Sequence, residues 1–163
     1  MASGKTTIGK LLSRSLLLPF FDLDSIIEIE LKATINEIFD QKGELFFRKK
    51  EREILESFLN TTDNYILALG GGTPCYYDNF NLYQNQEIKS FYLKASVFSL
   101  LERLKTQKNT RPLLANLNDG DLIEFVAKHL FERNYFYNNV QTIITVDNKN
   151  EEEIVSEILS KLA

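Results

Sequence analysis

The sequence opens with Met1-Ala2-Ser3-Gly4-Lys5-Thr6-Thr7, a segment whose residues indicate a phosphate-binding loop at the start of a helix. Its Gly4-Lys5-Thr6 segment is the closing half of a phosphate-binding loop, G-x-x-x-x-G-K-[ST], whose first glycine would precede Met1. Glycine lets backbone N–H groups turn toward a phosphate, and the helix that begins here adds its positive end. Lys5 brings a charge to the β- and γ-phosphates, and the Thr6 hydroxyl can bind Mg²⁺. A G-K-T tripeptide also occurs by chance, so the downstream residues must decide.

The composition predicts one globular domain. The chain has 163 residues, of which 44% are hydrophobic and 26% charged, enough to bury a sizeable core. A net charge of −4 argues against a broad surface for nucleic acid or anionic membrane. The single cysteine excludes an internal disulfide, and the single histidine gives histidine-based catalysis little to build on. Without a signal peptide or a membrane-length apolar run, we expect a cytoplasmic protein, monomeric by default.

Strands alternate with helices along the sequence, which predicts an α/β fold with a three-layer parallel sheet. Ser25 with Glu28 and Thr34 with Glu37 are two candidate capping boxes, and Gly43 is expected to end a short helix. The polar segment 106–120 reads as a mobile loop. The expected helices are at about 5–17, 26–31, 35–42, 44–59, 96–105, 122–137 and 151–162. The expected strands are at about 20–24, 65–69, 88–93 and 142–146.

Two candidate ligand sites follow predicted strands. Asp22 and Asp24 close the strand at 20–24, and ligands of open parallel sheets bind beyond the carboxyl ends of the strands. One carboxylate can hold Mg²⁺ through water while the other accepts a hydroxyl proton, although a solvated turn is the plain alternative. Gly70-Gly71-Gly72 follows the strand at 65–69, and three successive glycines suggest backbone in close approach to another group.

Three arginines are candidate anion ligands. Glu51 lies three residues after Arg48 on one helix face and can hold it toward a ligand carboxylate. The pair alone favours an ordinary surface ion pair. Arg111, in the segment 106–120, is either a clamp for a transferring phosphate or a basic loop residue. Arg133, one turn before Tyr137, is a second carboxylate clamp or an exposed arginine.

Taken together and in order, these segments resemble the shikimate kinase family over almost the whole chain. The phosphate loop alone is shared by many kinases, whereas the aspartate pair, the F-R-x-x-E helix, the triple glycine and the R-P-L-L segment are much more specific in this order. The matching segments are Ala2–Gly9, Phe21–Asp24, Ile35–Phe39, Gly43–Arg48 with Glu51, Gly70–Gly72, Arg111–Leu114, and Arg133 with Tyr137.

The resemblance implies a P-loop kinase fold of the nucleoside-monophosphate-kinase type, with a five-stranded parallel sheet of order 2-3-1-4-5. It implies a single domain over 1–163, with substrate-binding helices at about 25–60 and a mobile lid at about 106–120. The implied reaction transfers the ATP γ-phosphate to the 3-hydroxyl of shikimate, within aromatic amino-acid biosynthesis. Mg²⁺ is the implied cofactor and ATP the co-substrate, with no nucleic-acid or membrane partner.

The resemblance also implies residue roles on the nucleotide side. Lys5 contacts the β- and γ-phosphates, Thr6 binds Mg²⁺, and Asp22 supports the metal through water. Arg111 closes from the lid onto the phosphates, and Arg103 helps line the adenine site. The implied nucleotide-binding set is Ala2, Ser3, Gly4, Lys5, Thr6, Thr7, Arg103 and Arg111.

On the substrate side, the resemblance implies that Asp24 binds shikimate hydroxyls and is the candidate base. Arg48 and Arg133 hold the substrate carboxylate, and the backbone at Gly70, Gly71 and Gly72 lies against the substrate. Lys5, Asp24 and Arg111 form the implied catalytic set.

The sequence departs from the family at its start, because family members carry a central strand before the phosphate loop. Without that strand, buried backbone groups of its two neighbours would stay unpaired, at a cost of roughly 1–3 kcal/mol each. Our hypothesis is that Met1 is an internal methionine of a longer natural chain. Two functional alternatives stay open: a kinase for another small hydroxylated substrate, such as gluconate, and a non-catalytic nucleotide-binding relic or inactive fragment.

Overall fold

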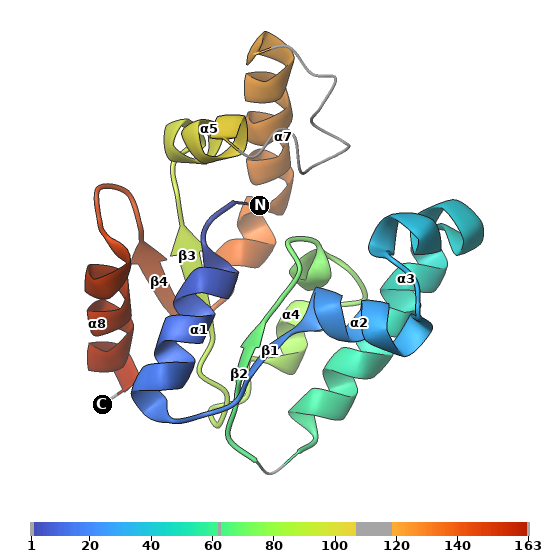
Figure 1. Cartoon of the computed structure of the whole chain (residues 1–163), viewed down its shortest axis with the longest axis horizontal. Helices are drawn as coiled ribbons and strands as arrows, with labels where there is room; N and C mark the ends of the chain where they lie inside the picture. Colours follow the sequence, from blue (N-terminus) through green and yellow to red (C-terminus); the bar gives the residue numbers. More distant parts are fainter. Residues whose placement is uncertain (1, 62, 107–118, 163) are drawn as a thin grey trace.

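The computed structural model of the chain describes residues 2–61, 63–106 and 119–162 (Figure 1). Helices and strands alternate through these residues, as the sequence predicts. In chain order the elements are α1 (Lys5–Leu16), β1 (Phe20–Asp22), α2 (Leu23–Leu31), α3 (Ile35–Leu59), β2 (Ile66–Ala68), the 3₁₀ helix η1 (Thr73–Cys75), α4 (Asn79–Leu82), β3 (Phe91–Lys94), α5 (Val97–Thr106), α7 (Asp119–Asn138), β4 (Thr142–Thr145) and α8 (Glu151–Leu162).

The strands form two parallel pairs. β1 pairs with β2, so that Asp22 lies opposite Ala68, and β3 pairs with β4, so that Lys94 lies opposite Thr145. The order 2-3-1-4-5 counts the strand before the phosphate loop as strand 1. In that order β1 and β2 correspond to strands 2 and 3, β3 and β4 correspond to strands 4 and 5, and strand 1 stands between the two pairs. Within the described ranges no strand joins β2 to β3. The parallel α/β architecture predicted from the sequence is confirmed.

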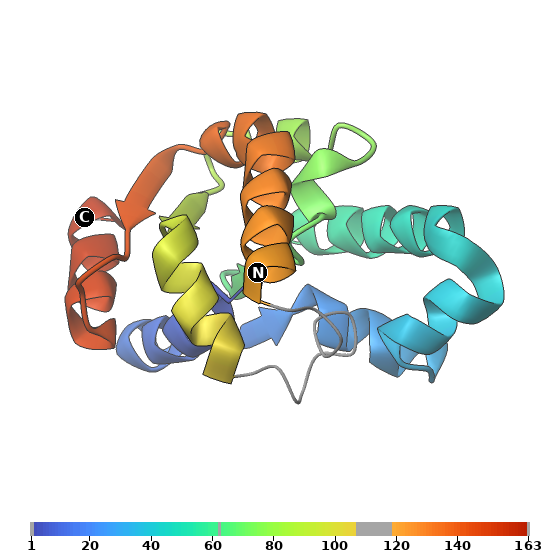
Figure 2. The ribbon, with the colours of Figure 1, turned by 90° about the horizontal axis from the view of Figure 1, so that it is seen from above.

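Helices divide the molecule into two halves. α1 packs against β1, β2 and α8, while α5 packs against α7 and α8 against β4. α2 and α3 pack on each other beside β1 and extend away from the α8 end of the molecule (Figures 1 and 2). α1 therefore spans the two strand pairs, and the α2–α3 unit forms a separate arm beyond them.

Each half has its own apolar core. The larger core joins α1, α5, α7 and α8 to β3 and β4, with Leu104, Leu122 and Ile144 fully buried. The smaller core lies between α2 and α3, where Leu23, Ile27 and Leu55 are almost completely inaccessible. Because burial of apolar area is the main stabilising term in folding, these two cores hold the elements that carry the polar residues described below.

The start of α2 differs from the prediction. The helix begins at Leu23 instead of Ile26, with Asp22 as its N-cap, so Asp24 lies in the first helical turn and not at the end of a strand. The capping box predicted at Ser25 is therefore wrong. Glu28 instead accepts a hydrogen bond from the backbone N–H of Ile35, at 2.9 Å. Burial of Leu23 in the smaller core favours the earlier start.

The start of α3 agrees with the prediction. Thr34 and Glu37 form a capping box, in which the Thr34 N–H donates to Glu37 Oε2 at 2.7 Å and the Glu37 N–H donates to Thr34 Oγ1 at 3.3 Å. Gly43 then interrupts the helix with φ 80° and ψ 167°, a conformation that a side chain would strain. The predicted helix end at Gly43 is confirmed as a kink between two helical segments.

Two other element boundaries differ from the prediction. β3 begins at Phe91 instead of Ile88, and α7 begins at Asp119, within the segment expected to be a loop. The residues 107–118 of that segment lie outside the described residues. None of the helices in the described ranges combines the length and apolar character needed to cross a bilayer.

Candidate functional site

The phosphate-binding loop leads directly into α1. Gly4 is the N-cap of this helix, with φ 91° and ψ 14°, a left-handed conformation that favours glycine. Its carbonyl accepts the N–H of Ile8 at 2.9 Å, so the helix starts at Lys5. The N–H groups of the first turn have no partner within an α-helix and form an anion site with the helix dipole.

A cavity of about 800 Å³ opens over this loop. Ala2–Ile8 form one wall, and Arg103 reaches in from α5, where its Nη1 donates to the Ala2 carbonyl at 3.3 Å. Residues 149–152, around the start of α8, also line this cavity, and the sequence did not indicate them as site residues. Asn150 caps that helix: its Oδ1 accepts the Glu153 N–H at 2.9 Å. This N-x-x-E cap was the available signal, but only the fold brings it to the same cavity as the phosphate loop.

The two aspartates differ in their surroundings. Asp22 Oδ2 accepts a hydrogen bond from Thr6 Oγ1 at 2.9 Å, which brings β1 and the phosphate loop together. Hard oxygen ligands at this spacing fit Mg²⁺, which is commonly bound by one or two carboxylates, hydroxyls and water. Thr6 and Asp22 could therefore contribute oxygen ligands to such an ion.

Asp24 has a strongly perturbed carboxyl group. Its pKa is raised from 3.8 to about 6, chiefly by burial and then by the negative charges of Asp22 and Glu51. The positive charges of Lys5 and Arg48 act in the opposite direction. Asp24 thus lies within electrostatic range of both the phosphate loop and the arginine on α3. A carboxyl group titrating near neutrality is typical of a general base.

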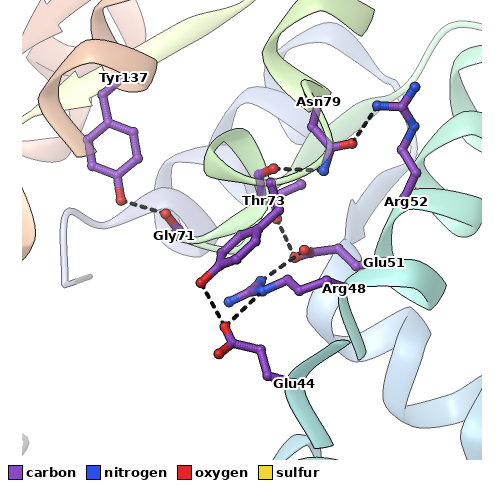
Figure 3. A network of polar contacts seen from close by, with 9 residues as sticks. Glu44, Arg48, Glu51, Arg52, Gly71, Thr73, Asn79 and Tyr137 are labelled. Atoms are coloured by element: carbon purple, nitrogen blue, oxygen red, sulfur yellow. Dashed lines mark hydrogen bonds and ion pairs between the residues drawn. The ribbon is translucent and has the colours of Figure 1, made fainter. Parts of the chain in front are cut away.

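Arg48 and Glu51 are buried. The prediction of an ordinary surface ion pair, which the two residues favour when taken alone, is therefore wrong. Arg48 Nη1 donates to Glu51 Oε2 at 2.9 Å, and Glu51 has no exposed surface. Thr73 Oγ1 donates to the other oxygen of Glu51 at 2.6 Å (Figure 3). A buried charge is costly unless it is paired and hydrogen-bonded, and here both carboxylate oxygens are satisfied. The predicted role of Glu51, to orient Arg48, agrees with this geometry.

The network continues into the glycine-rich segment after β2. Asn79 Nδ2 donates to the Thr73 carbonyl at 2.7 Å, and Arg52 Nη1 donates to Asn79 Oδ1 at 2.9 Å (Figure 3). Tyr137 on α7 donates through its hydroxyl to the Gly71 carbonyl at 2.6 Å. The sequence does not single out Thr73 and Asn79, because a threonine and an asparagine after a glycine run look like ordinary turn residues.

The close approach predicted at the triple glycine is confirmed at two positions. A Cβ at Gly70 would lie 2.7 Å from Asp24 Oδ1, and a Cβ at Gly72 would lie 2.5 Å from Arg48 Nη2. Both separations are too short for a side chain. The backbone of this segment therefore lies directly against the two side chains that the sequence singles out on α2 and α3.

Arg133 lies one helical turn before Tyr137 on α7. A hydrogen bond with Arg133, and then the positive charge of Arg133, counter the rise that burial causes in the Tyr137 pKa. The same charge lowers the pKa of Glu44 on α3. Arg133 and Arg48 thus approach the same region from two helices. Arg111 lies outside the described residues, so its role stays a prediction from the sequence.

The chain is similar to known proteins over its full length. A family model described as shikimate kinase matches residues 1–163. A shikimate kinase of Flavobacterium psychrophilum is 53% identical, over 97% of this chain and 92% of the relative. One of Flavobacterium johnsoniae is 47% identical, over all of this chain and 95% of the relative.

Solved structures give the same result. The crystal structure of a shikimate kinase from Bacteroides thetaiotaomicron superimposes with a TM-score of 0.91 at 35% identity, covering 99% of this chain and 93% of that one. A shikimate kinase from Acinetobacter baumannii, solved in complex with shikimate, superimposes with a TM-score of 0.86 at 29% identity, covering 99% and 88%. With the matched family model and the identities above, these findings establish that the chain belongs to the shikimate kinase family.

Proposed function

We propose that this protein transfers the γ-phosphate of ATP to the 3-hydroxyl of shikimate, giving shikimate 3-phosphate for aromatic amino-acid biosynthesis. Family membership and the similarity to a kinase solved with shikimate support this reaction. The observation that carries the proposal is the position of Asp24. Its carboxyl group has a raised pKa and interacts electrostatically with both Lys5 of the phosphate loop and Arg48 of α3. A phosphate donor and an anionic acceptor would therefore meet at this residue.

On the donor side, the loop 2–7 would wrap the ATP phosphates with its backbone N–H groups, and Lys5 would contact the β- and γ-phosphates. Arg103 would lie against the adenosine part of ATP, because Arg103 and the loop line the same cavity. Thr6 and Asp22 would hold Mg²⁺. When bound, the ion neutralises charge that develops on the transferred phosphoryl group.

On the acceptor side, α2 and α3 would form the substrate-binding part of the single domain. Arg48 and Arg133 would bind the shikimate carboxylate, because guanidinium groups match carboxylates in charge and shape. The backbone at Gly70–Gly72 would pack against the ring of the substrate. Asp24 would accept the proton of the 3-hydroxyl. At the same time the oxygen of that hydroxyl would bond to the γ-phosphorus, and the bond between the γ-phosphorus and the ADP oxygen would break.

A coupled assay of ADP release tests the proposal. We expect ADP release that depends on shikimate and Mg²⁺, with shikimate 3-phosphate as the product by mass spectrometry. Gluconate under the same conditions is the matched acceptor control, and we expect no turnover above the ATP background. Turnover with gluconate and not shikimate, or ATP binding without any turnover, would overturn the assignment.

A substitution at Asp22 tests the metal site. Asp22→Asn should raise the Mg²⁺ concentration for half-maximal activity by roughly tenfold or more, because groups that orient a bound metal contribute strongly to its affinity. Activity should largely return at saturating Mg²⁺. Asp40→Asn, on the exposed surface of α3, is the control. An unchanged Mg²⁺ titration for Asp22→Asn would remove this residue from the metal site.

We further propose that the protein is a monomer and that it acts in the cytoplasm, where ATP is available. All the groups assigned above come from one chain, and the net charge of −4 does not favour binding to nucleic acid or anionic membranes. Light scattering at assay concentration measures the mass directly.

A further inference from the structure

Arg48 has a second set of neighbours that the proposed reaction does not use. Its Nε donates to Glu44 Oε1 at 3.3 Å, and its Cζ lies 4.2 Å from the centre of the Tyr76 ring. The Tyr76 hydroxyl donates to the same oxygen of Glu44 at 2.8 Å. Arg48, Glu44 and Tyr76 thus form a closed triangle of contacts that uses other atoms of the guanidinium than the Glu51 ion pair.

The backbone explains how the three residues meet. Glu44 immediately follows the kink at Gly43, and Arg48 lies one helical turn later on the same face of α3. Tyr76 follows η1 in an extended conformation, with φ −119° and ψ 148°. The segment that carries Tyr76 is tied to α3 through Asn79 and Arg52. The Tyr76 ring is therefore held over the guanidinium by two segments: α3, which carries Arg48, and the segment after η1, which carries Tyr76.

The hydrogen bonds of Arg48 leave a defined edge for a ligand. Nε is taken by Glu44 and one N–H of Nη1 by Glu51, while among the described residues no acceptor contacts Nη2. Nη2 is also the atom nearest to the position of a Cβ on Gly72. Two carboxylates on two edges and an aromatic ring on a face fix the plane of the guanidinium, so the Nη2 edge points toward the glycine segment.

The charge states fit this arrangement. The hydrogen bond from Tyr76, with a smaller contribution from Arg48, lowers the pKa of Glu44, so Glu44 stays ionised near neutral pH. The hydrogen bond to Glu44 raises the pKa of Tyr76, so its hydroxyl stays a donor. Arg133 acts electrostatically on both residues. The triangle therefore lies beside both arginines assigned to the substrate carboxylate.

We propose that Tyr76 and Glu44 are positioning residues for the substrate carboxylate: the tyrosine holds the glutamate, and the pair fixes the plane in which Arg48 presents its Nη2 edge. This inference rests on the proposed function, since it assigns Arg48 to the shikimate carboxylate. Neither residue touches the reacting atoms, so both should act on substrate affinity more than on the chemical step.

Steady-state kinetics of Tyr76→Phe, Glu44→Gln and the double variant test the proposal. Each single variant should raise KM for shikimate by roughly five- to tenfold, with kcat and KM for ATP within about twofold of wild type. Because both act through one hydrogen bond, the double variant should be about as impaired as Glu44→Gln alone. Tyr77→Phe, at the neighbouring exposed tyrosine, is the matched control and should have no effect.

A second acceptor separates positioning from general damage. With the neutral carboxamide of shikimate, the ratio of wild-type to Tyr76→Phe activity should fall to about one, because no carboxylate is present for Arg48 to orient. Equal effects with shikimate and its amide, effects on KM for ATP of the same size, or additive effects in the double variant would overturn the inference. Wild-type turnover with shikimate in the same series tests the proposed function separately, so the two failures are distinguishable.

Discussion

Replacing Asp24 by asparagine is expected to lower kcat by about 10²- to 10⁴-fold, the range typical of a lost general base. Asparagine keeps the size and the hydrogen-bonding atoms of the side chain but cannot take the 3-hydroxyl proton at neutral pH. KM for ATP should change little, since the phosphate loop is untouched. The measurement is shikimate-dependent ADP release, with Asp40→Asn as a surface control.

The raised pKa of Asp24 also predicts the pH dependence of the wild-type enzyme. The base must be ionised to accept a proton, so kcat/KM should fall about tenfold per pH unit below about pH 6. In Asp24→Asn this limb of the profile should disappear. A wild-type profile that stays flat from pH 7 down to pH 5 would contradict the assignment of Asp24 as the base.

The same substitution should stabilise the fold at neutral pH. Asp24 ionises near pH 3.8 when unfolded and near pH 6 when folded, so the folded state carries the full cost of the buried charge above pH 6 and none below pH 3.8. The shift corresponds to at most about 3 kcal/mol, and partial exposure reduces the expected gain to roughly 1–2 kcal/mol. Thermal unfolding of Asp24→Asn should show a higher Tm at pH 7.5, and this difference should fade toward pH 4.

Gly72→Ala should raise KM for shikimate by roughly 30- to 100-fold, as expected when a charge-assisted contact is lost. The backbone at Gly72 has φ −90° and ψ −21°, which alanine adopts without strain. The effect therefore comes from the side chain alone, because a Cβ there would lie 2.5 Å from Arg48 Nη2 and 2.9 Å from its Cζ. Arg48 is held by Glu51 and Glu44, so it cannot move aside without breaking these contacts.

Two comparisons make the Gly72 experiment decisive. Arg48→Lys should produce a similar rise in KM for shikimate, because an ammonium group cannot reproduce the fork of N–H donors. KM for ATP should stay near the wild-type value in both variants. A lower Tm is expected for Gly72→Ala, since displacing Arg48 leaves the buried Glu51 without its partner. A threefold or smaller change in KM for shikimate would show that the Arg48–Gly72 contact does not matter for substrate.

Local signals in the sequence predicted most elements but not all of their limits. The capping box at Thr34 and the glycine at position 43 act through bonds between near neighbours, and both predictions are confirmed. Ser25 with Glu28 carries the same pattern and fails, because burial of Leu23 starts α2 earlier and Glu28 caps the next helix instead. A short-range pattern cannot reveal which of two competing helix starts buries more apolar surface.

The phosphate loop, the α/β alternation, and the residue types that a phosphate, a metal and a carboxylate require could all be predicted without a structure. Those features depend on backbone conformation and side-chain chemistry that each residue carries with it. Three features became apparent only in the folded chain. Arg48 and Glu51 are buried, Gly70 and Gly72 lie against Asp24 and Arg48, and the start of α8 lines the same cavity as the phosphate loop. The physical reason is that burial and contact arise between segments far apart in the chain, and the packing of the two cores sets those distances.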